Sequence, residues 1–289
     1  MKKVLCILSI LALVAVSASA KKKAPKIKTV EVATATEFLD AIESNRMIIL
    51  TGDYYNITEA LSLPQYAKLG LDYDAAKNTN KNVFWVDNFD GPELHISNVQ
   101  NLTIVAGQDI VMFVIDPRYS DVITFENCSG IKLQGLTFGH TDEGYCDRGV
   151  LGFYNCSNCE VDRCDLYGCG TEGVVVSRCE QMTFRATKIR DCSYHIMHVM
   201  SSSHVLFDGC QFFRNREFDQ VNIYSCYDVV FDNCIFANNT GNLFNLDSNT
   251  IILRDSVILH DDMFLGDTDS IKFINSINEE YFHPEQAFG

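Results

Sequence analysis

Apolar residues recur along this chain at two fixed positions, two residues apart, within a unit that repeats every 20 to 29 residues. The first apolar column contains Leu102, Ile131, Cys159, Met182, Val205, Val229, Ile251 and Ile271. The second contains Ile104, Leu133, Val161, Phe184, Phe207, Phe231, Leu253 and Phe273. This alternation predicts that every repeat holds a short strand with one buried face.

Each repeat continues with further short apolar segments, separated by Asn, Asp, Gly and Ser residues that favour turns. Their apolar positions include Phe138, Leu166, Ile189, Phe212, Phe236 and Ile258. Strands this short cannot bury an apolar face within one repeat, so successive repeats must stack and share a core. The pattern therefore predicts an all-β solenoid. A leucine-rich horseshoe has a similar period, but its L-x-x-L-x-L core is absent.

The N-terminal part carries two further signals. Residues 1–20 run from two lysines through an apolar stretch to an A-x-A pattern, which is typical of a signal peptide, and a basic segment that we expect to be flexible follows at 21–28. Cys6 lacks a lipobox context, so we expect a secreted or periplasmic protein rather than a lipoprotein. No later apolar run reaches the ~18 residues that a transmembrane helix needs.

The stretch "TATEFLDAIESNR" predicts a helix, with Thr36 as N-cap and Phe38, Leu39 and Ile42 on one face. We expect residues 29–60 to cap the open apolar end of the solenoid. Residues 29–289 then form one domain, with repeat coils over 95–280.

The stacked "YSCYDVVFDNCIFANN" copies resemble those of the right-handed parallel β-helix proteins, and in particular the secreted bacterial β-helix repeat proteins of the pectate-lyase-like superfamily. The resemblance covers residues 95–280 and implies a right-handed coil with an N-terminal capping helix. Many such families are polysaccharide lyases, glycosidases or epimerases, while others are adhesins or tailspikes. No catalytic motif of the pectate lyases or polygalacturonases is recognisable, so whether this chain is an enzyme stays open.

Cysteine is frequent, with four in residues 155–170 alone, and it has three possible roles. Cys156, Cys179 and Cys226 share a repeat column with Ser202, which favours ladders of small buried thiols. A disulfide or two remains an alternative. A metal site is disfavoured because the cysteines of one coil point in different directions, which tetrahedral zinc does not tolerate.

The net charge of −15 makes nucleic acid an improbable partner and favours a neutral or cationic glycan, or an anionic one bridged by a cation such as calcium. Solenoids bind along an outer strand face. Before the cysteine column runs a strand whose predicted outward residues suit sugar rings. They are Tyr154, Ser177, His198, Met200, Asn222, Tyr224 and Phe244.

Three residues before the His198 position, Glu172, His195 and Asp219 should form a row along the coil stack. A histidine between two carboxylates can serve acid and base roles on a glycoside. Strict alternation would point this row inward, unless the preceding turn resets it. The alternative interpretation is that these residues are solvated or cap turns.

A lengthened coil, "GHTDEGYCDRG", adds His140, Asp147 and Arg148 beside the same face. Its acidic residues leave calcium possible, although the spacing is not that of an EF-hand and a solvated loop is the simpler interpretation. No metal site is assigned. The leading hypothesis is a glycan-binding or glycan-processing β-helix, and the alternative is a non-catalytic interaction module. We assign catalytic roles to Glu172, His195, His198 and Asp219, and substrate binding to Arg148, Tyr154, Asn222, Tyr224, His140 and Asp147.

Overall fold

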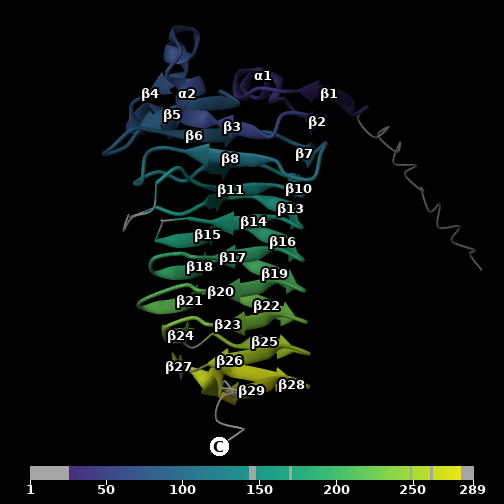
Figure 1. Cartoon of the computed structure of the whole chain (residues 1–289), viewed down its shortest axis with the longest axis vertical. Coiled ribbons are helices and arrows are strands. Elements are labelled where there is room, and N and C mark those ends of the chain that lie inside the picture. Colours follow the sequence, from purple (N-terminus) through teal and green to yellow (C-terminus); the bar gives the residue numbers. More distant parts are fainter. Residues whose placement is uncertain (1–25, 143–147, 169–170, 248, 261–262, 281–289) are drawn as a thin grey trace, which may run out of the picture.

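The chain folds into a column of stacked coils, each built from three short strands (Figure 1). The computed structural model describes residues 26–142, 148–168, 171–247, 249–260 and 263–280. Equivalent strands of successive coils pair in parallel and form three long sheets, which we call A, B and C. The predicted parallel β-helix is therefore confirmed.

Each sheet takes one strand from nearly every coil. In chain order, sheet A contains β1 (Lys28–Val32), β2 (Arg46–Leu50), β7 (Leu102–Ala106), β10 (Lys132–Gln134), β13 (Ser157–Asp162), β16 (Glu180–Arg185), β19 (Ser203–Asp208), β22 (Tyr227–Asp232), β25 (Ile251–Arg254) and β28 (Ile271–Ile274). Sheet B contains β3 (Tyr54–Asn56), β8 (Met112–Ile115), β11 (Thr137–His140), β14 (Asp165–Tyr167), β17 (Lys188–Arg190), β20 (Gln211–Phe213), β23 (Ile235–Ala237), β26 (Val257–His260) and β29 (Ile277–Glu280). Sheet C contains β4 (Gly70–Leu71), β5 (Val83–Asp87), β6 (Pro92–Ser97), β9 (Ile123–Glu126), β12 (Leu151–Tyr154), β15 (Glu172–Ser177), β18 (His195–Met200), β21 (Asp219–Tyr224), β24 (Gly241–Asn245) and β27 (Met263–Gly266).

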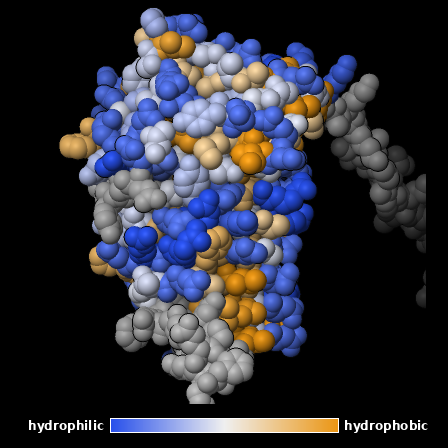
Figure 2. Space-filling model, in the orientation of Figure 1, coloured by the Kyte–Doolittle hydropathy of each residue, from blue (hydrophilic) through white to orange (hydrophobic). Residues whose placement is uncertain are grey.

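The outer surface is mostly polar on the face shown in Figure 2, with hydrophobic side chains gathered toward the C-terminal coils. Sheet B exposes two isoleucines in that region, Ile235 on β23 and Ile277 on β29. No described helix has the length and apolar character that a membrane crossing needs.

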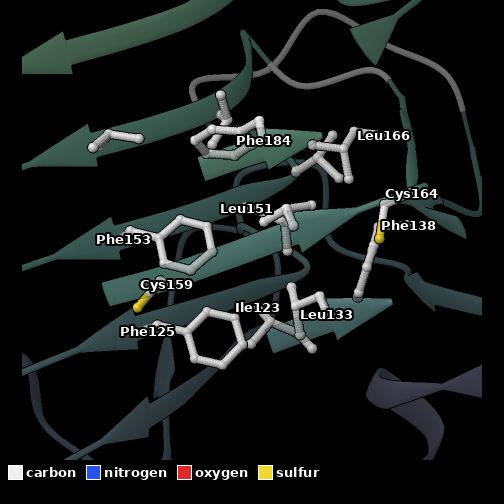
Figure 3. Close-up of a cluster of buried hydrophobic side chains, with 14 of the residues drawn as sticks. Ile123, Phe125, Leu133, Phe138, Leu151, Phe153, Cys159, Cys164, Leu166 and Phe184 are labelled. Carbon is white, nitrogen blue, oxygen red and sulfur yellow. The ribbon is translucent and has the colours of Figure 1, made fainter. Parts of the chain in front are cut away.

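The interior is filled by side chains that repeat from coil to coil, as the two apolar columns predicted. Phe207 stacks on Phe184 and on Phe231, with ring centroids 4.8 Å apart in both pairs. Figure 3 shows the same arrangement for Phe125 and Phe153. Because every coil depends on its neighbours for these contacts, the core is continuous along the column.

The corners between the sheets combine a left-handed residue with a small polar one. In the corner from sheet C to sheet A, for example, Arg178 has φ 54° and Cys179 follows it, pointing inward. The Cys179 thiol donates to the carbonyls of Ser177 at 3.3 Å and Phe153 at 3.4 Å, while its backbone N–H donates to Ser202 Oγ. Small side chains that both donate and accept thus satisfy backbone groups that the turn leaves unpaired.

The cysteine ladder is confirmed for the corner column. Cys128, Cys156 and Cys179 are buried, Cys226 is partly buried, and no disulfide joins these four. In the next corner the equivalent positions hold Cys164, Thr187, Cys210, Cys234, Ser256 and Ser276, which make the same kind of hydrogen bond. Exchange of Cys with Ser and Thr shows that hydrogen bonding and small size define the column.

Three short helices lie at the N-terminal end: α1 (Ala35–Ala41), α2 (Ile57–Leu61) and α3 (Tyr73–Ala76), with a 3-10 helix at Pro64–Leu69 between the last two. A second 3-10 helix lies at Thr268–Ser270. Helix α1 buries Phe38 against Phe113 of the first coils, with ring centroids 4.9 Å apart, so the expected capping helix is confirmed.

The expected N-cap of this helix was wrong. Thr34 holds the position, accepting from the Glu37 N–H at 3.2 Å, while the Glu37 carboxylate accepts from the Ala33 N–H at 2.7 Å. The T-x-x-E spacing from Thr34 to Glu37 is that of a capping box, with the Glu37 carboxylate bonded to the residue before the N-cap, and Thr36 lies inside the first turn.

The register predicted from the sequence is wrong by one residue in strand β24. Phe244 pairs with Val221 and is buried, whereas Asn245 pairs with Asn222 on the outer face. Phe244 is therefore not an outward residue. Asn222 pairs with Asn245 but Val229 pairs with Ile251, so the corner after β24 is one residue shorter than the corner after β21, and counting back from that corner misplaces the strand by one residue.

Candidate functional site on the outer face of sheet C

Sheet C presents a continuous row of outward positions that crosses seven strands from β6 to β24. The paired residues of this central column are His95, Thr124, Gly152, Val175, His198, Asn222 and Asn245. Polar groups gather at its two ends. We call the residues around His95 the upper cluster (Glu93, His95, Asp121, Glu126, Arg148 and Tyr154) and those around His198 the lower cluster (Glu172, His195, His198, Asp219, Asn222, Tyr224, Asn242 and Asn245).

The lower cluster is organised around the Asp219 carboxylate. Asn242 Nδ2 donates to one of its oxygens at 2.6 Å, and Asn245 Nδ2 donates to the other at 2.8 Å. Asn245 also lies 2.8 Å from the Tyr224 hydroxyl, which donates to Asn222 Oδ1 at 3.1 Å. One negative charge is thus held by neutral amides, and the network links adjacent strands of the sheet.

His195 belongs to this network through its Nδ1 atom. Nδ1 contacts the carbonyl oxygen of Asp219, which also accepts from Asn222 Nδ2 at 2.8 Å. Since a carbonyl oxygen only accepts, the contact with Asp219 is a hydrogen bond in the tautomer with the proton on Nδ1, which leaves Nε2 as the acceptor; the Asn222 amide, 3.0 Å from the same Nδ1, can donate to it only in the other tautomer. Ile196 and Met197 are both buried between His195 and His198. Two consecutive buried residues interrupt the in-and-out alternation of the strand, so both histidines reach the outer face.

Glu172 pairs with His195 along the row, as the sequence predicted. Its carboxylate accepts from the Thr171 hydroxyl and lies 3.9 Å from His198 Nδ1. Burial acts to raise the pKa of Glu172, but His198 and Thr171 outweigh it and hold the pKa below its usual range. The His198 ring meets the Tyr224 ring edge to face, with centroids 5.4 Å apart.

The upper cluster borders a cavity of about 440 Å³ in the same face. Its floor comes from β6, β9 and β12, and α3 and β5 stand on the side toward the cap. The lining residues that carry a charge or an aromatic ring are Tyr73, Lys77, Glu93, His95, Glu126, Arg148, Tyr154 and Arg178. This volume is typical of a ligand site.

His95 lies between two carboxylates. Its Nε2 is 3.1 Å from Glu93 Oε1, and its Nδ1 is 3.1 Å from Glu126 Oε1. Burial acts to lower the pKa of His95, but the two hydrogen-bonded carboxylates dominate and raise it to about 9. His95 is therefore a charged donor at neutral pH.

Asp121 is buried behind this group. Burial and the neighbouring Glu93 charge raise its pKa to about 7, while Thr124 Oγ1 lies 3.0 Å from carboxylate oxygens of both acids. Gly152 provides the space that Asp121 occupies, because a Cβ at Gly152 would lie 2.5 Å from Asp121 Oδ2. The glycine in the central column is thus required by the carboxylate beneath it.

Arg148 and Tyr154 complete the cavity lining. The Glu93 and Asp121 carboxylates attract the Arg148 guanidinium, yet no ion pair to it is formed within the described part of the chain. Burial and the charge of Asp121 raise the pKa of Tyr154, so its phenol stays protonated at neutral pH. Both side chains are available as donors to a ligand.

The structure brings together most of the residues assigned from sequence. All of Glu172, His195, His198, Asp219, Asn222 and Tyr224 lie in one contiguous cluster, while Arg148 and Tyr154 line the neighbouring cavity. His140 is a correction: it is buried, its Nε2 lies 2.9 Å from the Ser120 carbonyl oxygen, and it does not line the cavity. Asp147 lies outside the described residues.

Sequence reasoning missed Glu93, His95, Asp121 and Glu126. The signal was present in "PELHIS", where Glu93 and His95 alternate with apolar residues, but the coils before residue 95 lack the cysteine column that sets the register. Among the described residues, no group of three or more potential metal ligands is arranged around a common point.

Comparison with known proteins agrees with this geometry. The family model described as right handed beta helix region matches residues 120–276. The chain belongs to this right-handed β-helix family. None of the curated proteins gives a significant match.

Among solved structures, a pectate lyase from Paenibacillus sp. 0602 is similar, with a TM-score of 0.55 and 10% sequence identity over 86% of this chain and 77% of that one. The pectate lyase Pel9A aligns with a TM-score of 0.46 and 10% identity over 89% and 78% of the two chains. At such identities the likeness concerns the fold.

Proposed function

We propose that this chain binds an acidic glycan along the outer face of sheet C and cleaves it with the acid and base groups of the lower cluster. The observation that carries the proposal is the charge of the upper cavity. Lys77, His95, Arg148 and Arg178 line it with two carboxylates, Glu93 and Glu126, in a chain whose net charge is −15. Two further acids lie outside the lining: Asp74, which pairs with Lys77 at 3.3 Å, and Asp121, buried behind Arg148. A local excess of cations attracts anionic groups such as sugar carboxylates or sulfates.

The glycan part of the proposal rests on the shape and chemistry of the face. Thr124 and His198 stand three coil steps apart in the central column, ~14 Å at ~4.8 Å per step, so a chain of several sugars spans both clusters. Aromatic and amide groups such as Tyr154, Tyr224 and Asn222 offer ring surface and hydrogen bonds to hydroxyl groups. The name of the similar pectate lyase from Paenibacillus sp. 0602 is in line with such a ligand.

The cleavage part rests on His195, whose Nε2 is the basic atom of the neutral ring when Nδ1 donates to the Asp219 carbonyl, and on Glu172 and His198 beside it. Asp219 is better suited to positioning than to proton transfer, because amides occupy both of its oxygens. The same amide network favours one alternative, in which the face only binds a glycan. Secretion through the segment 1–20, outside the described residues, remains part of the proposal.

The test is calorimetric titration with oligogalacturonides, alginate oligosaccharides and neutral cello-oligosaccharides. We expect acidic glycans to bind and Arg148→Gln to weaken them about tenfold or more, because a buried charged contact is lost. Lys188→Ala on sheet B is the matched control and should bind as the wild type does. Equal binding of neutral and acidic glycans, or none of either, would refute the proposed ligand.

Cleavage is tested separately by product analysis on any glycan that binds. His195→Ala and His198→Ala should lower the rate about a hundredfold or more if these imidazoles transfer protons. An unsaturated product identifies elimination, and a new reducing end without unsaturation identifies hydrolysis. Binding without any product supports the binding-only alternative.

A further inference from the structure

The insertion between α2 and β6, residues 62–91, leaves the coil and builds one side of the upper cavity. It contains the 3-10 helix at Pro64–Leu69 together with β4, α3 and β5. Strand β5 pairs antiparallel with β6, so the parallel stacking of sheet C is interrupted there, and Phe84 of β5 pairs with His95 and stacks on its ring with centroids 4.9 Å apart. Tyr73, Ala76 and Lys77 then line the cavity beyond this point. The insertion therefore stands across the path of any chain that follows the column toward the cap.

Hydrogen bonds attach this wall to the body of the protein. Trp85 Nε1 donates to the Tyr66 carbonyl at 3.1 Å, and the Tyr66 hydroxyl donates to the Thr36 carbonyl at 3.0 Å. The Trp85 ring fills the space over Gly70, where a Cβ would lie 2.5 Å from the ring. Because the insertion is tied to helix α1 through Tyr66 and to β6 through the pairing of β5, it is part of the fold.

The inner side of the wall carries groups that suit a sugar. Tyr73 is 64% exposed, and Lys77 Nζ lies 4.0 Å from the centroid of its ring. An exposed phenol ring offers a stacking surface, and the adjacent ammonium group, which pairs with the exposed Asp74 carboxylate at 3.3 Å, can exchange that partner for a sugar carboxylate. Glu126 and Arg148 face the same space from the sheet.

We propose that the upper cavity holds the terminal sugar of an acidic glycan, with the remaining units running over β12, β15 and β18 toward the lower cluster. This inference rests on the proposed function and adds that the protein recognises chain ends. The wall of Tyr73, Ala76 and Lys77 stops the glycan on the cap side. Cleavage at the lower cluster then releases short oligosaccharides of uniform length from that end.

The experiment titrates the protein with short, medium and long oligogalacturonides of defined length, with alginate oligosaccharides run in parallel. An end-binding site gives one site per glycan chain at every length, so the sites per gram fall in proportion as the chains grow. An internal site gives sites per gram that stay level or rise with length. The second result overturns the inference while leaving the proposed function intact, and absence of binding by every acidic glycan overturns both.

Two further measurements test which end of the glycan enters the cavity and whether the wall contacts the bound glycan. Reducing-end labelling by reductive amination should abolish binding if that end enters the cavity and leave it unchanged if the other end enters. Tyr73→Ala should weaken short oligosaccharides about tenfold, and Tyr227→Ala, a similarly exposed tyrosine on sheet A, should not. If Tyr73→Ala and Tyr227→Ala bound short oligosaccharides with equal affinity, the wall would not be part of the binding site.

Discussion

The upper and lower clusters occupy the same outward columns of sheet C, yet they hold charge in opposite ways. In the upper cluster, His95 lies between Glu93 and Glu126, and Asp121 is buried behind them. In the lower cluster, the Asp219 carboxylate is held by two neutral asparagines. Equivalent positions of a repeat can therefore carry a charge-dependent site or an amide-based one.

This difference has a consequence for what each cluster does. Charged groups buried away from water interact strongly and change with pH, whereas amides keep their hydrogen-bonding pattern at any physiological pH. The upper cluster thus suits recognition of an anionic group, and the lower cluster gives a fixed frame for the imidazoles of His195 and His198.

The largest expected effect is the loss of Glu93. Its carboxylate contacts His95, Thr124, the Asp121 N–H and the Asn88 amide, so Glu93→Ala leaves a buried imidazolium and several donors short of an acceptor. We expect a loss of ~3–5 kcal/mol in the free energy of unfolding, measured by urea denaturation. Asp219→Ala should cost less, about 1–3 kcal/mol, because it strands neutral amides near the surface. Equal losses would contradict the distinction between the two clusters.

The second effect is a pH dependence that comes from the upper cluster. The pKa of His95 is raised from 6.5 to about 9, so its contribution to stability is complete below about pH 6.5 and is lost as the pH rises through 9. The pKa of Asp121 is raised from 3.8 to about 7, which also lowers stability as the pH rises through that range. The His95 part is on the order of 3 kcal/mol.

Melting temperatures recorded from about pH 5 to about pH 10 should therefore fall toward the alkaline side, because both groups lose protons over this range. His95→Gln should flatten the fall above about pH 6.5, and Asp121→Asn should flatten the part below about pH 7. Lys188→Ala should follow the wild-type curve. A melting temperature that rises with pH in the wild type would show that the upper cluster is not charged as described.

The third effect tests the space between the clusters. Gly152→Ala places a methyl group 2.5 Å from Asp121 Oδ2 and 2.9 Å from the Tyr154 ring, so the carboxylate must move. We expect a loss of ~1–3 kcal/mol by denaturation, as for other overpacked sites. Gly152→Ala should be equally destabilising when it is combined with Asp121→Asn, since the amide fills the same volume as the carboxylate. A neutral Gly152→Ala would mean that Asp121 has room to relocate.

The sequence predicted the coil stack, its register over β13 to β22 and the lower cluster, because all three follow the cysteine column. It assigned Arg148 and Tyr154 of the upper cluster but missed Glu93, His95, Asp121 and Glu126. These four precede Cys128, the first cysteine of the column, and an insertion and an antiparallel strand interrupt the repeat before them. It placed Phe244 on the wrong face because the corner after β24 is one residue shorter than the corner after β21, which the apolar pattern does not reveal. Burial of His140 depends on the Ser120 carbonyl, a contact that no local pattern encodes.

The smallest expected effect compares two tyrosines that stand in the same outward column, Tyr154 in the upper cluster and Tyr224 in the lower one. The Tyr224 hydroxyl donates to Asn222 and lies 2.8 Å from Asn245 Nδ2, so Tyr224→Phe should cost ~0.5–1.5 kcal/mol in denaturation experiments. The Tyr154 hydroxyl makes no hydrogen bond among the described residues, and Tyr154→Phe should leave stability nearly unchanged while weakening acidic glycans. If Tyr154→Phe were instead the more destabilising change, the stabilising hydrogen-bond network would lie in the upper cluster. The assignment of the upper cavity to ligand binding and of the lower cluster to a structural frame would then fail.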